Sequence, residues 1–381
     1  MKKVISSERI PIKLWLDDIE DGALEQAKNL ANLSFAFKHI AIMPDSHQGF
    51  GMPIGGVLAT KDVIIPNAVG VDIGCGMIAV KTSLTEIDTD TIKTIMGKVR
   101  NVVPVGFSHQ SSKQTWEGFD DAPDIEVIQR ELESAKMQLG TLGGGNHFIE
   151  IQSGNDGHIW LMIHSGSRNF GLKTADFYHK KAISLCERWV SDIPTKDLSF
   201  LPLSTAEGKE YFDAMKYSLS FAQANRSLMM KNILEIVSDL TGATVEQEVN
   251  IHHNYAQFEN HFGENVIVHR KGATKATIDT IGIIPGSMGA HSYIVSGKGN
   301  PESFMSCSHG AGRKMSRNEA TKTLDLEKEK AKMSGIVHGL RSSSNLDEAP
   351  GAYKPIDVVM SNQSDLVDIL VELTPLGNIK G

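Results

Sequence analysis

Several reactive residues of this chain lie in short glycine-rich segments, and one of these is VGVDIGCGMI, residues 69–78. Asp72 and Cys75 lie three residues apart there. A thiolate with a carboxylate and imidazoles suits Mn²⁺, Co²⁺ or Zn²⁺ better than Mg²⁺ alone, and one sulfur can bridge two ions. The alternative is that Cys75 is a small buried apolar side chain, because free cysteines commonly are and Asp-x-x-Cys is no established zinc spacing.

Histidines in other segments offer further ligands for such a site. His147 follows three glycines in GGGNHF, and His164 ends the apolar run IWLMIH. His252 and His253 follow EVNI. Neutral imidazole is the commonest metal ligand, but each of these histidines could equally serve a structural role. Their positions alone leave both interpretations open.

A different chemistry is indicated by SCSHGAGRKMSR, residues 306–317. A neutral imidazole such as that of His309 can attack phosphorus and form a phosphoramidate. The amides of the following Gly-Ala-Gly turn and the Arg313 guanidinium can hold phosphate oxygens. In IIPGSMGAHS, Pro285 through Met288 can present amides and a hydroxyl to a nucleotide. Taken alone, the first segment is also typical of a surface turn and the second of a β-hairpin.

The overall charge gives no support to nucleic-acid binding, because the formal net charge is −8. Any basic surface must therefore be local. Basic residues cluster at Arg168, at Arg226, in HRKG at 269–272 and from Arg313 to Arg317. If these segments face one groove, they form a track for phosphates; the alternative for each is a solubilising role.

The composition is that of a globular protein, with 40% hydrophobic and 22% charged residues in a chain of 381. The first residues lack the apolar core of a signal peptide, and no apolar run approaches the ~18 residues of a membrane span. The three cysteines, Cys75, Cys186 and Cys307, form no disulfide framework. These features predict a reduced, cytoplasmic protein without a membrane segment.

Recognisable helices and strands separate the reactive segments. Apolar periodicity predicts helices over 21–33, 124–139, about 207–240 and, with alternating charge, 319–333. Strand-like runs cover 35–43, 77–82, 158–164, 266–269, 278–284, 291–297 and 355–360. Their irregular order favours one compact α+β domain over residues 1–381, with mixed central sheets and surrounding helices. The many glycine-rich turns predict one polar pocket lined by loops.

A series of segments resembles the RtcB family of RNA-splicing ligases. In chain order these are MPDSHQGFGMPIGG, VGVDIGCGM, GGGNHFIE, HSGSRNFG, HHNYA, HRKGAT, PGSMGAHSYIV, SCSHGAGRKMSR, AYKPIDVV and the terminal IKG. They run from residue 43 to the last residue, so the resemblance covers nearly the whole chain.

The resemblance implies an enzyme that joins RNA ending in a 3′-phosphate or 2′,3′-cyclic phosphate to RNA with a 5′-hydroxyl. It also implies that the enzyme uses GTP and Mn²⁺, with two ions in each active site. Carried over onto this chain, the ligands of the first ion are Asp72, Cys75 and His147. The ligands of the second ion are Cys75, His164 and His253. His253 is chosen over His252 because His253 directly precedes the Asn of the family motif.

The same resemblance implies the residues that handle the nucleotide, whereas the basic clusters supply the expected RNA contacts. His309 is the implied acceptor of GMP, and Glu150 and Lys380 are the implied readers of guanine. The full set of implied nucleotide contacts is Asn146, His147, Phe148, Ile149, Glu150, His253, Asn254, Pro285, Gly286, Ser287, Met288, Ser292, His309, Gly310, Ala311, Gly312 and Lys380. We expect Arg168, Arg226 and Arg313 to contact RNA.

The chain departs from the family pattern at Ser46, where an apolar residue is usual, and it is shorter than many members. Neither departure changes an implied ligand, so both favour a subfamily with its own RNA over loss of activity. Repair of nuclease-cut tRNA or ribosomal RNA in a bacterium is expected over intron splicing. Competing hypotheses are a two-metal RNA phosphodiesterase or cyclic-phosphate hydrolase without GTP, and a non-catalytic RNA-binding protein. His309 separates these, because a hydrolase needs no covalent guanylate site. The sequence leaves open whether an activator protein is needed and whether the protein is a monomer or a homodimer.

Overall fold

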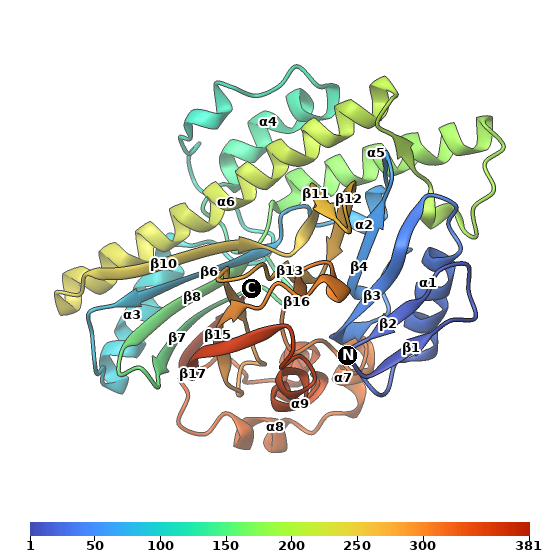
Figure 1. Ribbon diagram of the computed structural model, residues 1–381. Coiled ribbons are helices and arrows are strands. Elements are labelled where there is room, and N and C mark those ends of the chain that lie inside the picture. Colours follow the sequence, from blue (N-terminus) through green and yellow to red (C-terminus); the bar gives the residue numbers. More distant parts are fainter.

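Two β-sheets form the centre of the molecule in the computed structural model, which describes residues 1–381 (Figure 1). The six-stranded sheet has the order β1-β2-β3-β4-β12-β11, with one parallel pair, β2 and β3. Its strands are β1 (Lys3–Ile5), β2 (Ile12–Leu14), β3 (Ala36–His47), β4 (Ile54–Thr60), β12 (Glu264–Lys271) and β11 (Asn254–His261). The seven-stranded sheet has the order β10-β6-β8-β7-β17-β15-β14 and is antiparallel. Its strands are β10 (Val245–His252), β6 (Gly76–Thr82), β8 (Ile159–Ser165), β7 (Phe148–Gly154), β17 (Val367–Lys380), β15 (Ser292–Gly297) and β14 (Ile281–Ile284).

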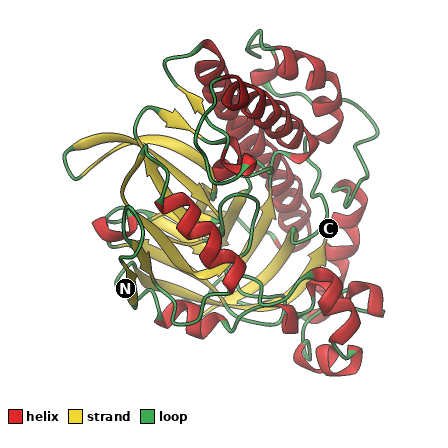
Figure 2. Cartoon of the chain, turned by 90° about the vertical axis from the view of Figure 1, so that its right-hand side faces the viewer, coloured by secondary structure: helices red, strands yellow, loops and turns green.

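Two short strand pairs and a set of helices complete the fold. The pairs are β13 (Ala273–Lys275) with β16 (Ser306–Ser308), and β5 (Val63–Ile64) with β9 (Leu201–Pro202). The α-helices are α1 (Asp21–Ala31), α2 (Pro66–Val69), α3 (Thr89–Val102), α4 (Glu126–Gln138), α5 (Arg168–Arg188), α6 (Ala206–Thr241), α7 (Arg317–Thr323), α8 (Leu326–Lys332) and α9 (Ile356–Ser361). Helices α4, α5 and α6 gather on one side of the sheets (Figure 1; Figure 2).

The long helix α6 links two parts of the hydrophobic core. The Thr205 hydroxyl caps its start by accepting a hydrogen bond from the Gly208 N–H at 3.1 Å. Gly242 ends it with a φ of +75°, a left-handed conformation that glycine adopts without a steric penalty. The first half of α6 packs on α4 and α5, and its second half packs on the seven-stranded sheet. None of the helices is both long and apolar enough to cross a membrane.

The observed elements confirm the predicted α+β class and most of the predicted segments. The helices expected over 21–33, 124–139 and 207–240 are α1, α4 and α6. The helix expected over 319–333 is interrupted: α7 ends at Thr323, and Asp325 starts α8 by accepting a hydrogen bond from the Lys328 N–H at 2.9 Å. The sequence reading did not predict α3 or α5.

The strand predicted over 355–360 is wrong, because this segment is helix α9. Its buried residues are Ile356, Val359 and Met360, which have helical spacing, whereas Val358 is exposed. Pro355 directly precedes the helix and, lacking an N–H, suits its first turn. A short apolar run does not distinguish a strand from a helix by periodicity alone.

Candidate active site

The register of four neighbouring strands brings the implied metal ligands together. Strand β6 begins directly after Cys75, β7 begins directly after His147, β8 carries His164 near its end, and β10 ends just before His253. In an antiparallel sheet the start of one strand lies beside the end of the next, about 4.8 Å away. The four side chains therefore meet at one edge of the seven-stranded sheet.

The ligand atoms of these residues form a compact, buried cluster. Cys75 Sγ lies 3.2 Å from His164 Nε2 and 3.5 Å from His147 Nε2. His164 Nε2 lies 3.3 Å from His253 Nε2, and His147 Nε2 lies 3.3 Å from Asp72 Oδ2. The three ligand atoms of Cys75, His147 and His164 lie within 4.8 Å of one another. This arrangement joins both implied ligand sets through Cys75.

Hydrogen bonds on the far side of the rings fix their orientation toward this cluster. His147 Nδ1 lies 2.9 Å from the Leu142 carbonyl oxygen, and His164 Nδ1 lies 3.1 Å from that of Asn146. Each Nδ1 therefore carries the proton and donates it, which leaves the Nε2 lone pair aimed at the cluster. His253 Nδ1 is buried without any hydrogen-bond partner. Burial lowers the pKa of His164 and of His253 well below the usual value, so both rings are neutral at pH 7.

The surroundings shift the pKa values of the two acidic ligands, Cys75 and Asp72, in opposite directions. Burial and the charge of Asp72 raise the pKa of the Cys75 thiol well above its usual value. Burial also disfavours the charged form of Asp72, but the hydrogen bond and charge of His147 and the charge of Arg168 hold its pKa below the usual range. The imidazole lone pairs and the carboxylate converge around a thiol that ionises only when a cation binds beside it. Such a set of ligands fits a site for divalent cations.

The start of helix α5 holds the Asp72 carboxylate in place. The Ser167 N–H and hydroxyl both donate to Asp72 Oδ1, at 3.1 and 3.2 Å. Gly166 packs so closely on this carboxylate that a Cβ atom there would lie 2.3 Å from both oxygens. Only glycine leaves room for Asp72 at this position.

Replacing Gly166 by alanine is expected to displace the Asp72 carboxylate and to weaken Mn²⁺ binding by about 10- to 100-fold, the usual range for loss of a ligand's support. Isothermal titration calorimetry with Mn²⁺ measures this effect. Gly97→Ala is the matched control, because a Cβ atom at Gly97 meets nothing within 4 Å. Equal Mn²⁺ affinity of the Gly166→Ala variant and the wild type would contradict the assignment of Asp72 as a ligand.

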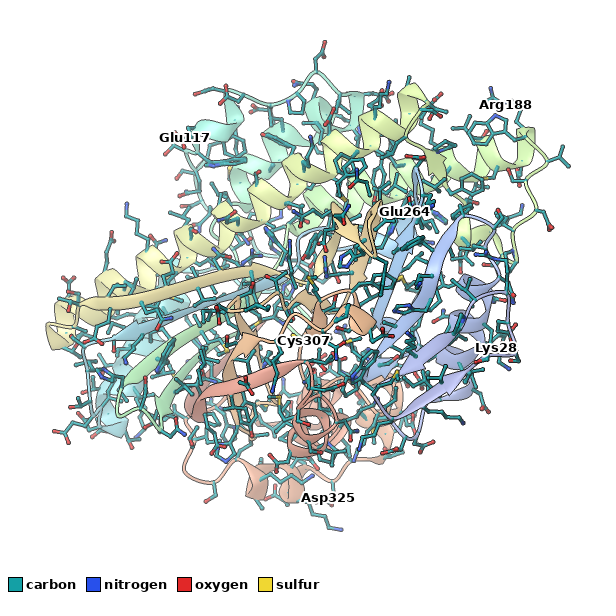
Figure 3. The ribbon with its side chains drawn as sticks, viewed as in Figure 1. Lys28, Glu117, Arg188, Glu264, Cys307 and Asp325 are labelled. Atoms are coloured by element: carbon teal, nitrogen blue, oxygen red, sulfur yellow. The ribbon has the colours of Figure 1, made fainter.

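His309 is brought to the same site by the β13–β16 pair near the centre of the molecule, where Cys307 is labelled (Figure 3). Its ring centre lies 4.7 Å from that of His253. Its Nδ1 lies 2.6 Å from Oδ2 of Asp45, and its backbone N–H donates to the same oxygen at 3.1 Å. Asp45 is fully buried at the end of β3. The carboxylate therefore fixes the proton on Nδ1 and leaves Nε2 as the free, nucleophilic nitrogen.

An Asp45→Asn variant is expected to lower the rate of phosphoryl transfer to His309 by about 10²-fold or more, because the carboxylate offsets the positive charge that develops on an attacking imidazole. The metal content should stay at the wild-type level, since Asp45 contacts none of the four clustered ligands. Single-turnover transfer from labelled GTP measures the rate. An unchanged rate would exclude the positioning role of Asp45.

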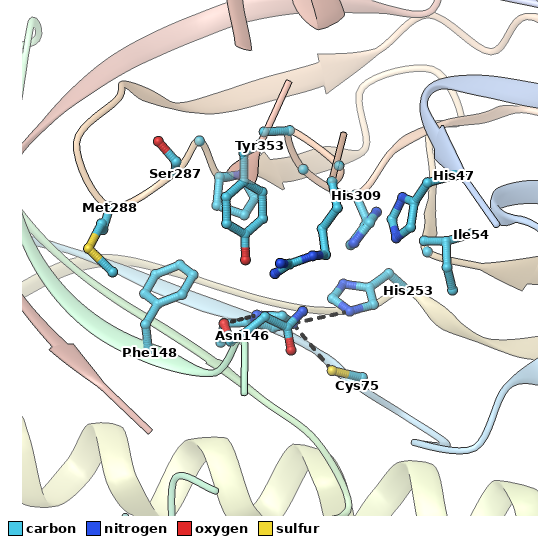
Figure 4. Close-up of a pocket in the computed structure, with 18 of the residues that line it drawn as sticks. His47, Ile54, Cys75, Asn146, Phe148, His253, Ser287, Met288, His309 and Tyr353 are labelled. Carbon is cyan, nitrogen blue, oxygen red and sulfur yellow. Dashed lines mark hydrogen bonds between the residues drawn. The ribbon is translucent and has the colours of Figure 1, made fainter. Parts of the chain in front are cut away.

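A polar pocket of about 260 Å³ opens between the side-chain cluster around Cys75 and His309 (Figure 4). His47, His253 and His309 lie side by side along it, with Cys75 at its base (Figure 4). Of the residues expected to bind metal or nucleotide, those that line it are Asp72, Cys75, Asn146, Phe148, Glu150, His164, His253, Asn254, Pro285, Gly286, Ser287, Met288, His309, Gly310, Ala311, Gly312 and Lys380. The loops that carry these residues come from both sheets, in agreement with the predicted loop-lined pocket.

The polar groups at one end of the pocket can distinguish one planar base from another by the donors and acceptors on the edge of the base. Burial raises the pKa of Glu150 to about 7, although hydrogen bonds from Asn378 and Gln152 and the charge of Lys380 favour its ionised form. Asn378 donates to Glu150 Oε1 at 2.8 Å. Lys380 lies over the Phe148 ring, with its Nζ 5.4 Å from the ring centre. A carboxylate and an ammonium beside an aromatic ring suit a planar ligand that offers both donors and an acceptor.

Glu348 is a buried anion that gathers the cationic side chains of this pocket. It lies 3.1 Å from Arg313 Nη1, 3.0 Å from Arg317 Nε and 3.7 Å from Lys380 Nζ. The Tyr353 hydroxyl donates to Glu348 Oε2, the oxygen that Lys380 also approaches. Glu348 therefore holds three cations at the edge of the nucleotide pocket, where they can turn toward phosphates.

Three residues expected to contact the nucleotide, His147, Ile149 and Ser292, do not line the pocket. The Ile149 side chain packs into the hydrophobic core beside α3 and α6, because alternate residues of β7 point to opposite faces. Ser292 is buried, and its hydroxyl accepts a hydrogen bond from the Gly286 N–H at 3.2 Å. The Ser292 side chain therefore supports the 285–288 loop, and the nucleotide contacts expected of these residues stay predictions.

The predicted basic track exists only in part. Arg226 is fully buried and donates to the carbonyl oxygens of Gly74 and Ser165, so the prediction that it contacts RNA is wrong. In the HRKG segment Arg270 is also fully buried, at 2.6 Å from Glu259. These arginines satisfy buried carbonyls and a carboxylate, a role that charge counting does not reveal. Arg313 lines the pocket, and Arg168 lies at its metal-binding end.

No role was predicted from the sequence for Asp45, His47, Glu348 or Tyr353, all of which the structure places at or beside this site, as it does Arg317. A signal existed for the first two, since PDSHQG is a glycine-rich turn with an acid and a histidine, and for the tyrosine in AYKPIDVV. Arg317 closes the SCSHGAGRKMSR block and was considered only for the phosphate track. Glu348 carried no pattern that distinguishes it from other acidic residues.

Comparison with known proteins identifies the family of this chain. A family model described as tRNA-splicing ligase RtcB matches residues 26–381. The RNA-splicing ligase RtcB of Escherichia coli K12 is 40% identical over 410 residues, which cover 100% of this chain and 99% of that protein. The tRNA-splicing ligase RtcB of Thermococcus kodakarensis is 31% identical over 458 residues, which cover 98% of this chain and 95% of that protein. The chain therefore belongs to the RtcB family of RNA-splicing ligases.

Proposed function

We propose that this protein is an RNA ligase that joins an end with a 3′-phosphate or 2′,3′-cyclic phosphate to a 5′-hydroxyl end, in RNA repair. It uses GTP as the energy source and two Mn²⁺ ions as cofactors. The observation that carries the proposal is the pairing of His309 with buried Asp45 beside the Cys–His cluster. An oriented imidazole is needed for covalent transfer of a nucleotide, whereas a metal-dependent hydrolase can work without one.

The proposed reaction has three steps. His309 Nε2 attacks the α-phosphorus of GTP, so that an N–P bond forms, the bond to the β-phosphate oxygen breaks and pyrophosphate leaves. An oxygen of the RNA 3′-phosphate then takes GMP from the histidine. The 5′-hydroxyl of the second RNA attacks the activated 3′-phosphorus, loses its proton, and releases GMP. A cyclic phosphate must first be opened by water to a 3′-phosphate.

The residues of the cluster suit the two proposed ions. Asp72, Cys75 and His147 would hold one, and Cys75, His164 and His253 the other. The close approach of the neutral Nε2 atoms of His164 and His253 supports this assignment. When bound, such ions neutralise phosphate charge and lower the pKa of a nearby hydroxyl. Asn254 supports the site by donating to the Asp72 carbonyl oxygen at 3.1 Å.

The preference for GTP is assigned to the far end of the pocket. Guanine presents adjacent N–H donors and a carbonyl acceptor on one edge, whereas adenine presents a different pattern. The Glu150 carboxylate accepts from the donors, and the Lys380 ammonium donates to the carbonyl oxygen. A site of this kind rejects the wrong base because its buried polar groups would be left unpaired.

The test is incubation with α-labelled GTP and Mn²⁺, followed by denaturation. A ligase is expected to carry acid-labile, alkali-stable label on the protein and to join matched RNA ends. The alternative, a two-metal cyclic-phosphate hydrolase, would convert a cyclic phosphate to a monoester without GTP and would take no label. Absence of label from fully metallated wild-type protein would overturn the ligase proposal.

A further inference from the structure

Phe107 has the highest exposed fraction of any large apolar side chain in the protein, at 103% of the reference area. Single exposed apolar side chains are common on protein surfaces, so exposure alone implies nothing. The position of this one is unusual, because the segment that carries it is attached to the active-site loops.

Backbone hydrogen bonds hold the segment Pro104–Ser108, here the Phe107 loop, against the glycine loop that precedes His147. The Gly106 N–H donates to the Gly143 carbonyl oxygen at 2.8 Å, and the Leu142 N–H donates to that of Pro104 at 2.9 Å. Val105 and Gly143 also form an isolated parallel β-bridge. The backbone that bears Phe107 is therefore held in place, and the Phe107 ring extends into solvent.

Two guanidinium groups flank the same glycine loop. A Cβ atom at Gly143 would lie 2.0 Å from Arg168 Nη1, and one at Gly145 would lie 2.6 Å from Arg317 Nη2. Arg168 Nη2 donates to the Gly106 carbonyl oxygen at 3.1 Å, which ties it to the Phe107 loop. Cations for phosphates beside an aromatic face for bases are the usual elements of a single-strand nucleic-acid site.

A second cavity of about 350 Å³ connects this region to the nucleotide pocket. It is lined by Val105 of the Phe107 loop, by Gly145 and by Arg100 of α3. It also shares Met288, Asn378 and Lys380 with the pocket that contains His309. The Phe107 loop therefore borders the space next to the reacting groups.

We propose that Phe107 is a stacking platform for an unpaired base of the RNA substrate near the ligation junction, with Arg168 and Arg317 contacting the adjacent phosphates. This inference rests on the proposed function for the identity of the substrate as RNA. An isolated ring flanked by Gly106 and Ser108 offers too little apolar surface for a protein partner, whereas one ring is enough to stack one base.

Direct binding in the absence of GTP tests the platform without requiring catalysis. Single-stranded RNAs carry 2-aminopurine at the terminal or adjacent position; one strand ends in a 3′-phosphate and the other begins with a 5′-hydroxyl. Wild-type protein and Mn²⁺ are expected to change the fluorescence of at least one probe. Phe107→Ala is expected to weaken binding of that strand about tenfold, and Phe107→Tyr to restore it. Phe262→Ala, at the exposed β11–β12 turn, is the matched control and should bind like the wild type.

Two results would overturn the platform. One is wild-type affinity of Phe107→Ala for both strands. The other is full recovery by Phe107→Leu, which would indicate general apolar contact in place of stacking. Labelling by GTP is measured separately: Phe107→Ala should accept GMP at the wild-type rate while its KM for RNA rises about tenfold. Loss of labelling in the wild type would refute the ligase chemistry, and the binding titration would still decide the role of Phe107.

Discussion

Replacing His309 by alanine is expected to abolish covalent labelling by GTP and to reduce RNA joining by at least about 10³-fold, because the proposed reaction has no other nucleophile for the α-phosphorus. The imidazole is already oriented, with Nδ1 at 2.6 Å from Asp45 and the ring 4.7 Å from that of His253. No other histidine of the pocket has a carboxylate partner on Nδ1; His47 Nδ1, for example, lies 3.1 Å from the Asp45 carbonyl oxygen. Labelled protein is counted after gel separation, and joined RNA is measured on a denaturing gel.

The His309→Ala variant should keep its metal, which distinguishes loss of the nucleophile from loss of the site. A matched control is His158→Ala, since His158 lies in the turn between β7 and β8 and contacts the Thr82 carbonyl oxygen. That variant should label and join RNA normally. Labelling of His309→Ala at the wild-type level would assign the covalent step to another residue and contradict the proposed mechanism.

Cys75→Ser is expected to lose metal and labelling together, by at least about 10²-fold in Mn²⁺ affinity, because a hydroxyl remains protonated where a thiol can ionise. Cys75 Sγ is the atom that lies near both His147 and His164. Removing it therefore affects both proposed ions. Metal content is measured by mass spectrometry after dialysis against Mn²⁺, and affinity by calorimetry.

The release of a proton from the Cys75 thiol on metal binding allows a second measurement for this residue. Burial and the charge of Asp72 raise the pKa of the metal-free Cys75 thiol, so it is protonated at pH 7 and must lose a proton when metal binds. Mn²⁺ binding by the wild type should therefore strengthen as the pH rises. Cys186→Ser is the matched control, because Cys186 is buried on α5 against Phe200. Full occupancy of both sites in Cys75→Ser would exclude a bridging sulfur.

Much of the fold followed from local patterns along the chain. Helices α1, α4 and α6 repeat apolar residues at helical spacing, and α6 is additionally marked by Thr205 and Gly242 at its ends. The run 355–360 was predicted as a strand and is α9, because six residues contain too few turns for periodicity to separate the two structures. Helix α5 was not predicted because the helical spacing of its apolar residues is less regular along RNFGLKTADFYHKKAISLCER.

The site was predictable to the extent that its residues lie in recognisable blocks. Asp72, Cys75, His147, His164 and His253 converge as the resemblance implied, since four of them lie at or next to strand ends and Asp72 lies in the turn before β6. The arginines show the limit of this reasoning. Arg226 has the residue type of an RNA contact, but its neighbours in space are buried carbonyl groups. Burial depends on the whole fold, and a count of charges cannot reveal it.

By itself the sequence determined the chemistry available to this protein: a thiol near a carboxylate, histidines in glycine-rich turns, and blocks that identify the family. The tertiary structure alone decided how these groups are paired. Asp45 meets His309 across 264 positions of the chain, and the Phe107 loop is joined to the active-site loops by hydrogen bonds of Gly106 with Gly143 and Arg168. Such contacts depend on strand register and on which surfaces are buried, and both arise only when distant segments pack against one another.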